Sequence, residues 1–211
     1  MRLAVDVMGG DHGPAVVVRG ALQALEMAEA IRELILVGKE DSIRPLVESS
    51  SANSRVRVVH ASDVVTMEDG PMDVLRRKKD SSMARAIDLV ASHEADAILS
   101  CGNTGGLLAA STIKLRRLRG IDRPAIATVI PTPENEFVLL DAGANVESKP
   151  IHLVHYAIMG SLYSSEVLGY SRPRVGLLCN GTEESKGNEL TQEAYRMCKL
   201  LDLNFVGNVE G

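Results

Sequence analysis

The sequence predicts a layered α/β fold around a largely parallel sheet. Short apolar runs alternate along the chain with segments of helical period, as in chains whose parallel strands are joined by helices. The strand-like runs are rich in β-branched residues and apolar on both faces, which is typical of strands covered by helices on both sides. No internal repeat and no linker rich in proline and glycine divides the 211 residues, so we expect a single α/β domain over 1–211.

Eight segments are expected to form strands, and RLAVD at 2–6 is typical of them. They span 2–6, 33–38, 56–60, 96–100, 125–130, 136–141, 174–179 and 204–206. The connection PTPEN between the fifth and the sixth is short enough for an antiparallel hairpin, so the sheet is expected to be mixed.

Six helices are expected between these strands. In the first, Val17, Ala21 and Leu25 fall on one face, as in an amphipathic helix. The third follows Asp80-Ser81-Ser82, a helix-start signal. The expected helices span 14–29, 41–50, 82–93, 104–117, 150–168 and 188–201. The stretch SSSANS at 49–54 is expected to be a surface loop.

Composition and charge argue against several classes of function. Aromatic residues make up 3% of the chain and tryptophan is absent, so a stacking platform for single-stranded nucleic acid is not expected. A net charge of −5 gives no default affinity for nucleic acid either. No apolar run approaches the ~18 residues of a membrane span. The N-terminal residues lack a signal-peptide pattern, and three cysteines without framework spacing fit a reducing compartment, so we expect a cytosolic protein.

Polar, glycine-rich loops follow four of the expected strands, and in a parallel sheet such loops converge on one edge. Glycine lets a backbone approach an anion closely, and helix N-termini supply free N–H groups. We therefore expect an edge that binds phosphate or carboxylate, with phosphate near the helix starts at Thr104 and Ser81. The four loops are 8–14, 101–106, 142–145 and 180–188.

The specific nucleotide fingerprints are absent. Neither G-x-x-x-x-G-K-[ST] nor G-x-G-x-x-G occurs, so nucleotide hydrolysis and a dinucleotide site are poorly supported. The spacing from Gly181 to Lys186 resembles a P-loop, but the glycine before the lysine is missing.

Two basic clusters stand out. The run RRKK at 76–79 precedes a helix start, where cations can complete an anion site; a solvated surface stretch is the alternative. The second, here called the 114–123 cluster, either complements the dipole of the helix that it ends or docks an acidic partner. Its members are Lys114, Arg116, Arg117, Arg119 and Arg123.

Other candidates for chemistry are weaker. His152 and His155 have a spacing that can bind metal, but no third ligand is evident, so we expect structural roles and no metal site. Cys101 is expected to be a small hydrophobic residue at a strand end rather than a nucleophile. Neither a Ser-His-Asp set nor a G-x-S-x-G elbow can be picked out.

Eight motifs carry a resemblance to a known family. They are MRLAVDVMGGDHGP, MDVLRRKKDSSM, ILSCGNTGGLL, GIDRPAIA, LLDAGANVESKP, YAIMGSLYS, GLLCNGTEESKGNEL and NFVGNVEG. In this order, from Met1 to Gly211, they resemble the bacterial phosphate acyltransferases of phospholipid synthesis. Members of that family are longer, so the chain is similar to their N-terminal two-thirds.

The resemblance implies a fold and a reaction. The fold is a three-layer α/β/α sandwich similar to the phosphotransacetylase and isocitrate dehydrogenase class, assembled as a homodimer. The reaction moves a long-chain acyl group from an acyl-carrier-protein thioester to inorganic phosphate, and it uses no cofactor and no metal. The family is cytoplasmic and peripherally membrane-associated, and it supplies a downstream membrane acyltransferase. Membrane contact is expected mostly in the C-terminal part that this chain does not match.

The resemblance also implies site residues. Phosphate is itself the nucleophile, so the site must hold a dianion near the thioester carbonyl and stabilise the tetrahedral oxyanion. The expected catalytic residues are Lys186, Asn145 and Asn103. The expected substrate-binding residues are Asp11, His12, Arg77, Lys78, Ser81, Ser82, Gly102, Thr104, Gly105, Asp141, Gly143 and Asn188. Cys101 stands where the motif usually has Ala, which weakens a catalytic role for it, and a role for Asn180 is doubtful because that position varies.

Two alternatives remain open. The first is a short-chain phosphotransacetylase that uses coenzyme A, which donor preference would distinguish. The second is a non-enzymatic phosphate-sensing module, which would bind phosphate without thioester turnover.

Overall fold

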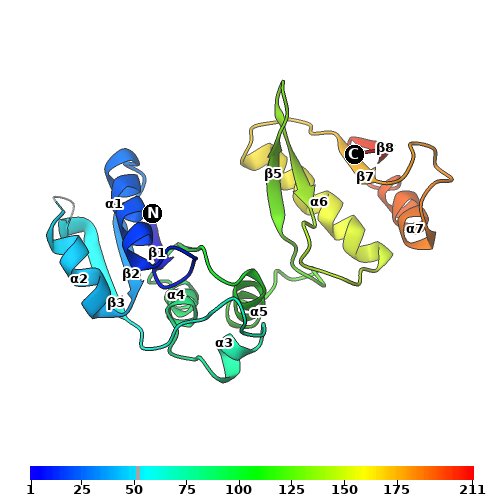
Figure 1. The fold of residues 1–211 in the computed structure, drawn as a ribbon. Helices are drawn as coiled ribbons and strands as arrows, with labels where there is room; N and C mark the ends of the chain where they lie inside the picture. The colour runs from blue at the N-terminus through cyan, green and yellow to red at the C-terminus, as the bar shows by residue number, and fades with distance from the viewer. Residues whose placement is uncertain (51–52) are drawn as a thin grey trace. The chain divides into compact units, whose positions relative to one another are not determined.

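The chain forms two compact units, Met1–Arg116 and Arg117–Gly211, each of which is described by itself (Figure 1). The structure is a computed structural model that describes residues 1–50 and 53–211. Strands and helices alternate in both units, and most strand pairs are parallel, so the expected α/β fold is confirmed. The single domain expected over 1–211 stays a prediction.

A four-stranded parallel sheet forms the centre of the first unit, in the order β3-β2-β1-β4. Its strands are β1 (Arg2–Asp6), β2 (Glu33–Gly38), β3 (Val56–His60) and β4 (Ala97–Ser100). Its helices are α1 (Pro14–Met27), α2 (Glu40–Glu48), the short α3 (Asp73–Arg76), α4 (Ser82–Ala91) and α5 (Thr104–Lys114), and a 3₁₀ turn, η1 (Asn53–Arg55), precedes β3.

The alternation of side chains along the strands explains the layers of this unit. Val5 and Leu34 point to one face and pack with α1 and α2. Ala4 and Ile35 point to the opposite face and pack with α4. Each fully buried Leu or Ile in these clusters stabilises the fold by about 1.5–3 kcal/mol. The expected three-layer α/β/α arrangement is therefore present in this unit.

The second unit contains two small sheets. β5 (Ala127–Pro131) and β6 (Glu136–Leu140) form the antiparallel hairpin that PTPEN predicts. β7 (Val175–Leu178) pairs in parallel with β8 (Phe205–Val209). Helices α6 (Pro150–Glu166) and α7 (Glu189–Cys198) pack together over a core that includes Val154 and Cys198. The antiparallel pairing thus lies in a separate sheet instead of making one mixed sheet.

Element boundaries differ from expectation by a few residues, and one difference has a clear physical cause. The helix expected over 104–117 ends at Lys114 because Arg116 adopts a left-handed conformation, with φ of 65°. In the expected loop 49–54, residues 51 and 52 lie outside the described residues. None of the described helices combines the length and the apolar character needed to cross a membrane.

One aspartate joins the starts of β1 and β4. Asp96 accepts hydrogen bonds from Arg2 through its main-chain N–H at 2.6 Å and its guanidinium at 2.7 Å. The Asp96 main-chain N–H donates in turn to the Arg2 carbonyl at 2.8 Å. The two hydrogen bonds that the carboxylate accepts lower the pKa of Asp96 to about 2, and the bond from the Arg2 guanidinium has the larger effect.

We predict that Asp96→Asn lowers stability at neutral pH and flattens its dependence on acid. The pKa of Asp96 is lower in the folded protein, at about 2, than its ordinary value of 3.8. Its contribution is therefore present above about pH 4 and is lost as the pH falls toward 2. Urea unfolding from pH 7 to pH 2 measures the effect. Asp202→Asn is the control, because no described residue donates a hydrogen bond to this exposed carboxylate; equal curves for both variants would contradict the assignment.

Candidate functional site

The carboxyl ends of β1 and β4 lie side by side at the point where the sheet order reverses. In the sheet, β1 lies between β2 and β4. The loop after β1 leads to α1 on one face, and the loop after β4 leads to α5, which packs with α4 on the opposite face. Ligands of open α/β sheets bind at such a switch point. The structure thus brings two of the four expected loops, 8–14 and 101–106, to one edge.

A buried carboxylate joins these two loops. Asp6, which ends β1, is 2% exposed and lies opposite Ser100 in the sheet register. The Ser100 hydroxyl donates to Asp6 Oδ2 at 2.7 Å and accepts from the Gly102 N–H at 3.1 Å. The Gly9 N–H donates to Asp6 Oδ1 at 3.2 Å. We call this set of four residues the Asp6 lock. Sequence reasoning missed Asp6 and Ser100; the available signal was a polar residue ending each of two apolar strands.

Two glycines let the loops approach. A Cβ added to Gly9 would lie 2.8 Å from Asp6 Oδ2 and 2.9 Å from the Gly102 nitrogen, closer than real contacts allow. A Cβ added to Gly102 would lie 3.2 Å from the Gly9 Cα. The backbone contact therefore requires glycine at position 9, and it leaves little room for a side chain at position 102.

Asn103 caps α5 and anchors it to a neighbouring loop. Its Oδ1 accepts from the Gly106 N–H at 2.8 Å, and its amide donates to the carbonyls of Thr66 (3.1 Å) and Asp69 (2.9 Å). Both amide donors of this expected catalytic side chain are thus in use. The backbone N–H groups of Thr104 and Gly105 have no hydrogen-bond partner within the described part of this unit.

The start of α4 is less open. Ser81 and Ser82 are buried, and the Ser82 N–H donates to the Asp63 carbonyl at 3.3 Å. The Ser81 hydroxyl caps the helix by accepting from the Ala84 N–H at 3.2 Å. The Ser82 hydroxyl is buried and has no partner among the described residues. Of the two helix starts expected to hold phosphate, α5 presents the freer backbone.

In the basic run at 76–79, Lys78 is half-buried and the other three residues are exposed. The Lys78 ammonium donates to the Val64 carbonyl at 2.7 Å and pairs with the Asp69 carboxylate. The hydrogen bond from Lys78 is the largest cause that lowers the pKa of Asp69. Arg77 is exposed and lies 3.5 Å from the Asp73 carboxylate. Lys78 therefore fastens the loop over 63–70, and Arg77 faces solvent. Asp11 and His12, in the turn after β1, are exposed as well.

Asp80 fastens the other end of that loop. It accepts from the Ser62 hydroxyl at 2.6 Å and the Ser62 N–H at 3.1 Å, and from Arg85 at 2.6 Å. These bonds, led by the Ser62 hydroxyl, lower the pKa of Asp80 to about 2.

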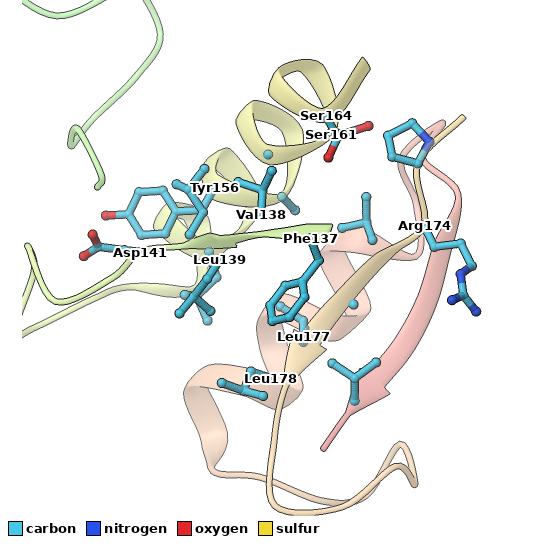
Figure 2. Close-up of a pocket in the computed structure, with 18 of the residues that line it drawn as sticks. Phe137, Val138, Leu139, Asp141, Tyr156, Ser161, Ser164, Arg174, Leu177 and Leu178 are labelled. Atoms are coloured by element: carbon cyan, nitrogen blue, oxygen red, sulfur yellow. The ribbon is translucent and has the colours of Figure 1, made fainter. Parts of the chain in front are cut away.

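The second unit contains a cavity of about 610 Å³ between its two small sheets and α6 (Figure 2). Its lining is mostly apolar, and Asp141, Asn145 and Tyr156 contribute polar groups. Figure 2 shows Asp141 and Tyr156 at one end, apart from Leu178. Burial and then the charge of Asp141 raise the pKa of Tyr156.

Asp141 organises the loop 142–145. Its carboxylate accepts from the N–H groups of Ile126 (2.9 Å), Ala144 (3.2 Å) and Asn145 (2.7 Å). The Asn145 amide donates to Asp141 Oδ2 at 3.0 Å and to the Pro124 carbonyl at 2.9 Å. Two expected site residues are thus in direct contact, and Gly143, with φ of 89°, makes the turn between them.

The loop 180–188 holds Lys186 at the surface. No carboxylate of the described residues pairs with the exposed Lys186 ammonium. A Cβ on Gly181 would lie 2.7 Å from Lys186 Cγ, so the lysine stem lies over this glycine. Asn188 caps α7 by accepting from the Thr191 N–H at 3.0 Å. Whether the expected residues of the two units form one site stays a prediction.

His152 and two members of the 114–123 cluster make contacts within the protein. The buried His152 accepts from the Lys149 N–H at 3.1 Å, and burial is the main cause that lowers its pKa. Among residues 1–50 and 53–211, no three His, Cys, Asp or Glu side chains are grouped to hold a metal ion. In the 114–123 cluster, Lys114 pairs with Asp88 at 2.7 Å and Arg123 donates to the Glu147 carbonyl at 3.0 Å.

Comparison with known proteins gives a consistent result. A family model described as fatty acid synthesis protein matches residues 1–211. A curated relative named phosphate acyltransferase, from Desulfitobacterium hafniense (strain Y51), is 52% identical over 211 residues, which are 100% of this chain and 62% of that protein. Proteins of the same name from Pelotomaculum thermopropionicum and Bacillus pumilus are each 48% identical over the whole chain and 61% and 62% of their own lengths. The chain therefore spans about three-fifths of these relatives.

A solved structure supports the fold. The EutD phosphotransacetylase from Staphylococcus aureus aligns with a TM-score of 0.69 and 16% identity, covering 100% of this chain and 68% of that one. At this identity the likeness shows the fold alone. It agrees with the expected likeness to the phosphotransacetylase class.

We predict that Gly9→Ala destabilises the first unit by about 1–3 kcal/mol, because the new methyl group must separate Asp6 from Gly102. The control is Gly20→Ala. Gly20 lies within α1 and has no atom near its Cβ position, so alanine there should stabilise the helix by up to about 1 kcal/mol. Urea unfolding measures both changes. A Gly9→Ala protein as stable as the starting chain would contradict the close approach.

We predict a second contrast between two capping asparagines. Asn103→Asp keeps the cap but places a carboxylate oxygen against two carbonyl groups, so it should cost about 2–3 kcal/mol. Asn188→Asp should be close to neutral, because that side chain serves its helix only as an acceptor and aspartate is a good N-cap. Thermal unfolding of both variants tests this; equal effects would show that the Asn103 amide donors contribute little.

Proposed function

Because this chain belongs to the family of fatty acid synthesis proteins, whose model matches its whole length, we propose that it contributes to an acyltransferase that moves an acyl group to inorganic phosphate. The donor in this proposal is a long-chain acyl thioester of acyl carrier protein. The product is an acyl phosphate for phospholipid synthesis. The relatives that carry the name phosphate acyltransferase support the acceptor and the class of reaction.

One observation carries the proposal. The Asp6 lock holds two glycine-rich loops together at the switch point of the sheet, beside the N-terminus of α5. There the N–H groups of Thr104 and Gly105 lack partners within residues 1–50 and 53–116. Free N–H groups at a helix N-terminus favour an anion such as phosphate.

The chemistry asks little of the side chains. Phosphate is anionic at neutral pH and attacks the thioester carbonyl itself, so neither a covalent acyl-enzyme nor a strong base is needed. The site has to orient phosphate and stabilise the oxyanion that develops on the carbonyl. We assign the first task to the backbone of Gly102, Thr104 and Gly105. We assign the second to Lys186, with Asn145 positioned by Asp141.

The remaining assignments of the proposal concern binding partners. Acyl carrier protein is acidic, so the exposed arginines of the 114–123 cluster suit its docking. We further propose a cytoplasmic homodimer that associates peripherally with the membrane and passes acyl phosphate to a downstream membrane acyltransferase. The enzyme would need neither a metal nor a cofactor.

A full-length hybrid tests the activity. In it, this chain replaces the matching part of the Desulfitobacterium hafniense (strain Y51) relative. We expect acyl phosphate to form from long-chain acyl carrier protein and phosphate. A folded hybrid that uses only short-chain acyl-coenzyme A would favour the phosphotransacetylase alternative. Binding of phosphate without turnover of either thioester would favour the sensing module.

We predict that Lys186→Ala in the hybrid lowers kcat by about 10²–10³, the usual loss when one electrostatic stabiliser of an oxyanion is removed. Lys186→Arg should recover only part, because a planar guanidinium fits the space differently. Lys199→Ala is the control. Lys199 lies at the end of α7 and pairs at 3.3 Å with Glu184, which belongs to the same loop as Lys186. A folded Lys186→Ala hybrid within about twofold of the parent at saturating substrates would refute the assignment.

We predict that reversing Arg116 and Arg117 to Glu raises KM for acyl carrier protein and weakens its salt dependence. Turnover at saturation should change little, because exposed charges act mainly on encounter. The matched control reverses Arg19 and Arg32, which are exposed elsewhere on the first unit. If KM and its salt dependence stay at the parent values, the cluster serves only the end of α5.

A further inference from the structure

A buried asparagine near the end of β8 holds the loop that follows β7. The two strands are parallel, so their carboxyl ends lie side by side, with Asn208 opposite Leu177. Asn208 is 5% exposed, and its Nδ2 donates to the Glu183 carbonyl at 2.8 Å. Within the second unit, all of which the structure describes, it is the only residue outside 179–199 that hydrogen-bonds the loop 180–188.

This loop depends on hydrogen bonds for its course, because most of its residues are exposed and pack against little. Asn180 Oδ1 accepts from the Gly187 N–H at 3.1 Å. Gln192 Nε2 donates to the Ser185 carbonyl at 2.8 Å. These two bonds join the loop to itself and to the helix that follows it. The bond from β8 is the one that joins it to a strand.

The carbonyl that Asn208 binds also fixes the backbone of Lys186. The Lys186 N–H donates to the Glu183 carbonyl at 3.0 Å, which closes a four-residue turn. A carbonyl oxygen has two lone pairs, so it can accept both bonds. The lysine stem then lies against Gly181, where an added Cβ would be 2.7 Å from Lys186 Cγ and 3.1 Å from its Cδ. The position of the ammonium therefore depends on the position of this turn.

The Asn208 side chain is only half satisfied. Its Oδ1 is buried and has no hydrogen-bond partner in the part of the chain that the structure describes. An unpaired buried acceptor costs about as much free energy as one neutral hydrogen bond contributes, or more. An apolar side chain of the same shape would therefore leave the protein about as stable, but it could not hold the Glu183 carbonyl.

We propose that Asn208 is a positioning residue for Lys186. By fixing the Glu183 carbonyl, it holds the turn that keeps the lysine ammonium close to the thioester oxygen on which negative charge develops. Asn208 does not touch the substrate, because its side chain is buried and bonded to the loop. This inference rests on the proposed function, which assigns that oxyanion to Lys186.

Kinetics of the full-length hybrid test the proposal. Asn208→Leu should lower kcat by about 10–100-fold, because a displacement of about 1 Å can cost about 10²-fold in rate. KM for phosphate should stay near the parent value, since the lost interaction belongs to the transition state. The midpoint of thermal unfolding should also stay near that of the parent, which separates a positioning role from a structural one. Asn208→Ala is the second variant if Asn208→Leu does not fold.

A matched control lies at the other end of the same strand. Asn204 directly precedes β8, and its Nδ2 donates to the Arg172 carbonyl at 3.1 Å. Asn204→Leu removes a bond of the same kind from the same unit and should leave kcat within about twofold of the parent. If both variants lower kcat equally, the loss comes from a general loosening of the unit, and the proposal is overturned.

A double-mutant cycle shows whether Asn208 acts through Lys186. In the Lys186→Ala hybrid, Asn208→Leu should change kcat by less than about twofold, because the group that it positions is absent. Additive losses would overturn the proposal. A hybrid that loses rate with Lys186→Ala but not with Asn208→Leu would also overturn it and leave the proposed function intact. A folded hybrid that makes no acyl phosphate would refute the proposed function and, with it, a role of Asn208 in the reaction.

Hydrogen exchange gives a readout that does not depend on activity. In the hybrid and in the chain of 211 residues, Asn208→Leu should speed exchange of the Lys186 amide by at least about threefold, because the acceptor of that amide is no longer held. The Cys179 amide, which donates to the Val209 carbonyl at 2.8 Å, should keep its parent rate and show that the strand pair is intact. An unchanged rate at Lys186 would contradict the proposal.

Discussion

A buried carboxylate at the end of β1 determines how the first unit presents its candidate site. Asp6 is shielded from water and needs donors, and it takes them from Ser100 on β4 and from the backbone of Gly9. These bonds require two loops to touch, and only glycine permits that contact at position 9. The N-terminus of α5 follows directly from this arrangement, because Asn103 comes right after the locked glycine.

The second unit uses a similar device. Asp141 follows β6 and accepts N–H groups from the glycine-containing loop behind it, as Asp6 does after β1. In both units, an aspartate at the end of a strand fixes a turn whose backbone stays near the surface. Lys78 and Asn103, which sequence reasoning placed at the ligand, bind the loop over 63–70, and their roles at a ligand stay a prediction. In the proposed site, the donors offered to an anion are the backbone N–H groups of Thr104 and Gly105.

The sequence predicted most elements of the fold because their periodicities are strong. The runs at 2–6 and 33–38 are short and apolar, and PTPEN left only a hairpin between its strands. The sequence could not predict α3, because four residues are too few for a helical period. It could not predict the division into separate sheets either, because strand pairing depends on contacts between residues that are distant in the chain. The glycine loops were found, but Asp6 and Ser100 were not, because their partnership depends on which strands become neighbours.

The central claim is that the Asp6 lock presents the start of α5 to an anion. The most direct measurement is a titration of the chain with inorganic phosphate, followed by the NMR shifts of its backbone amides. We predict that the amides of Thr104 and Gly105 move saturably, and that sulfate competes. The Asp6→Asn protein, if folded, should show weaker saturation at the same amides. Shifts that leave Thr104 and Gly105 unchanged, or that never saturate, would contradict the account.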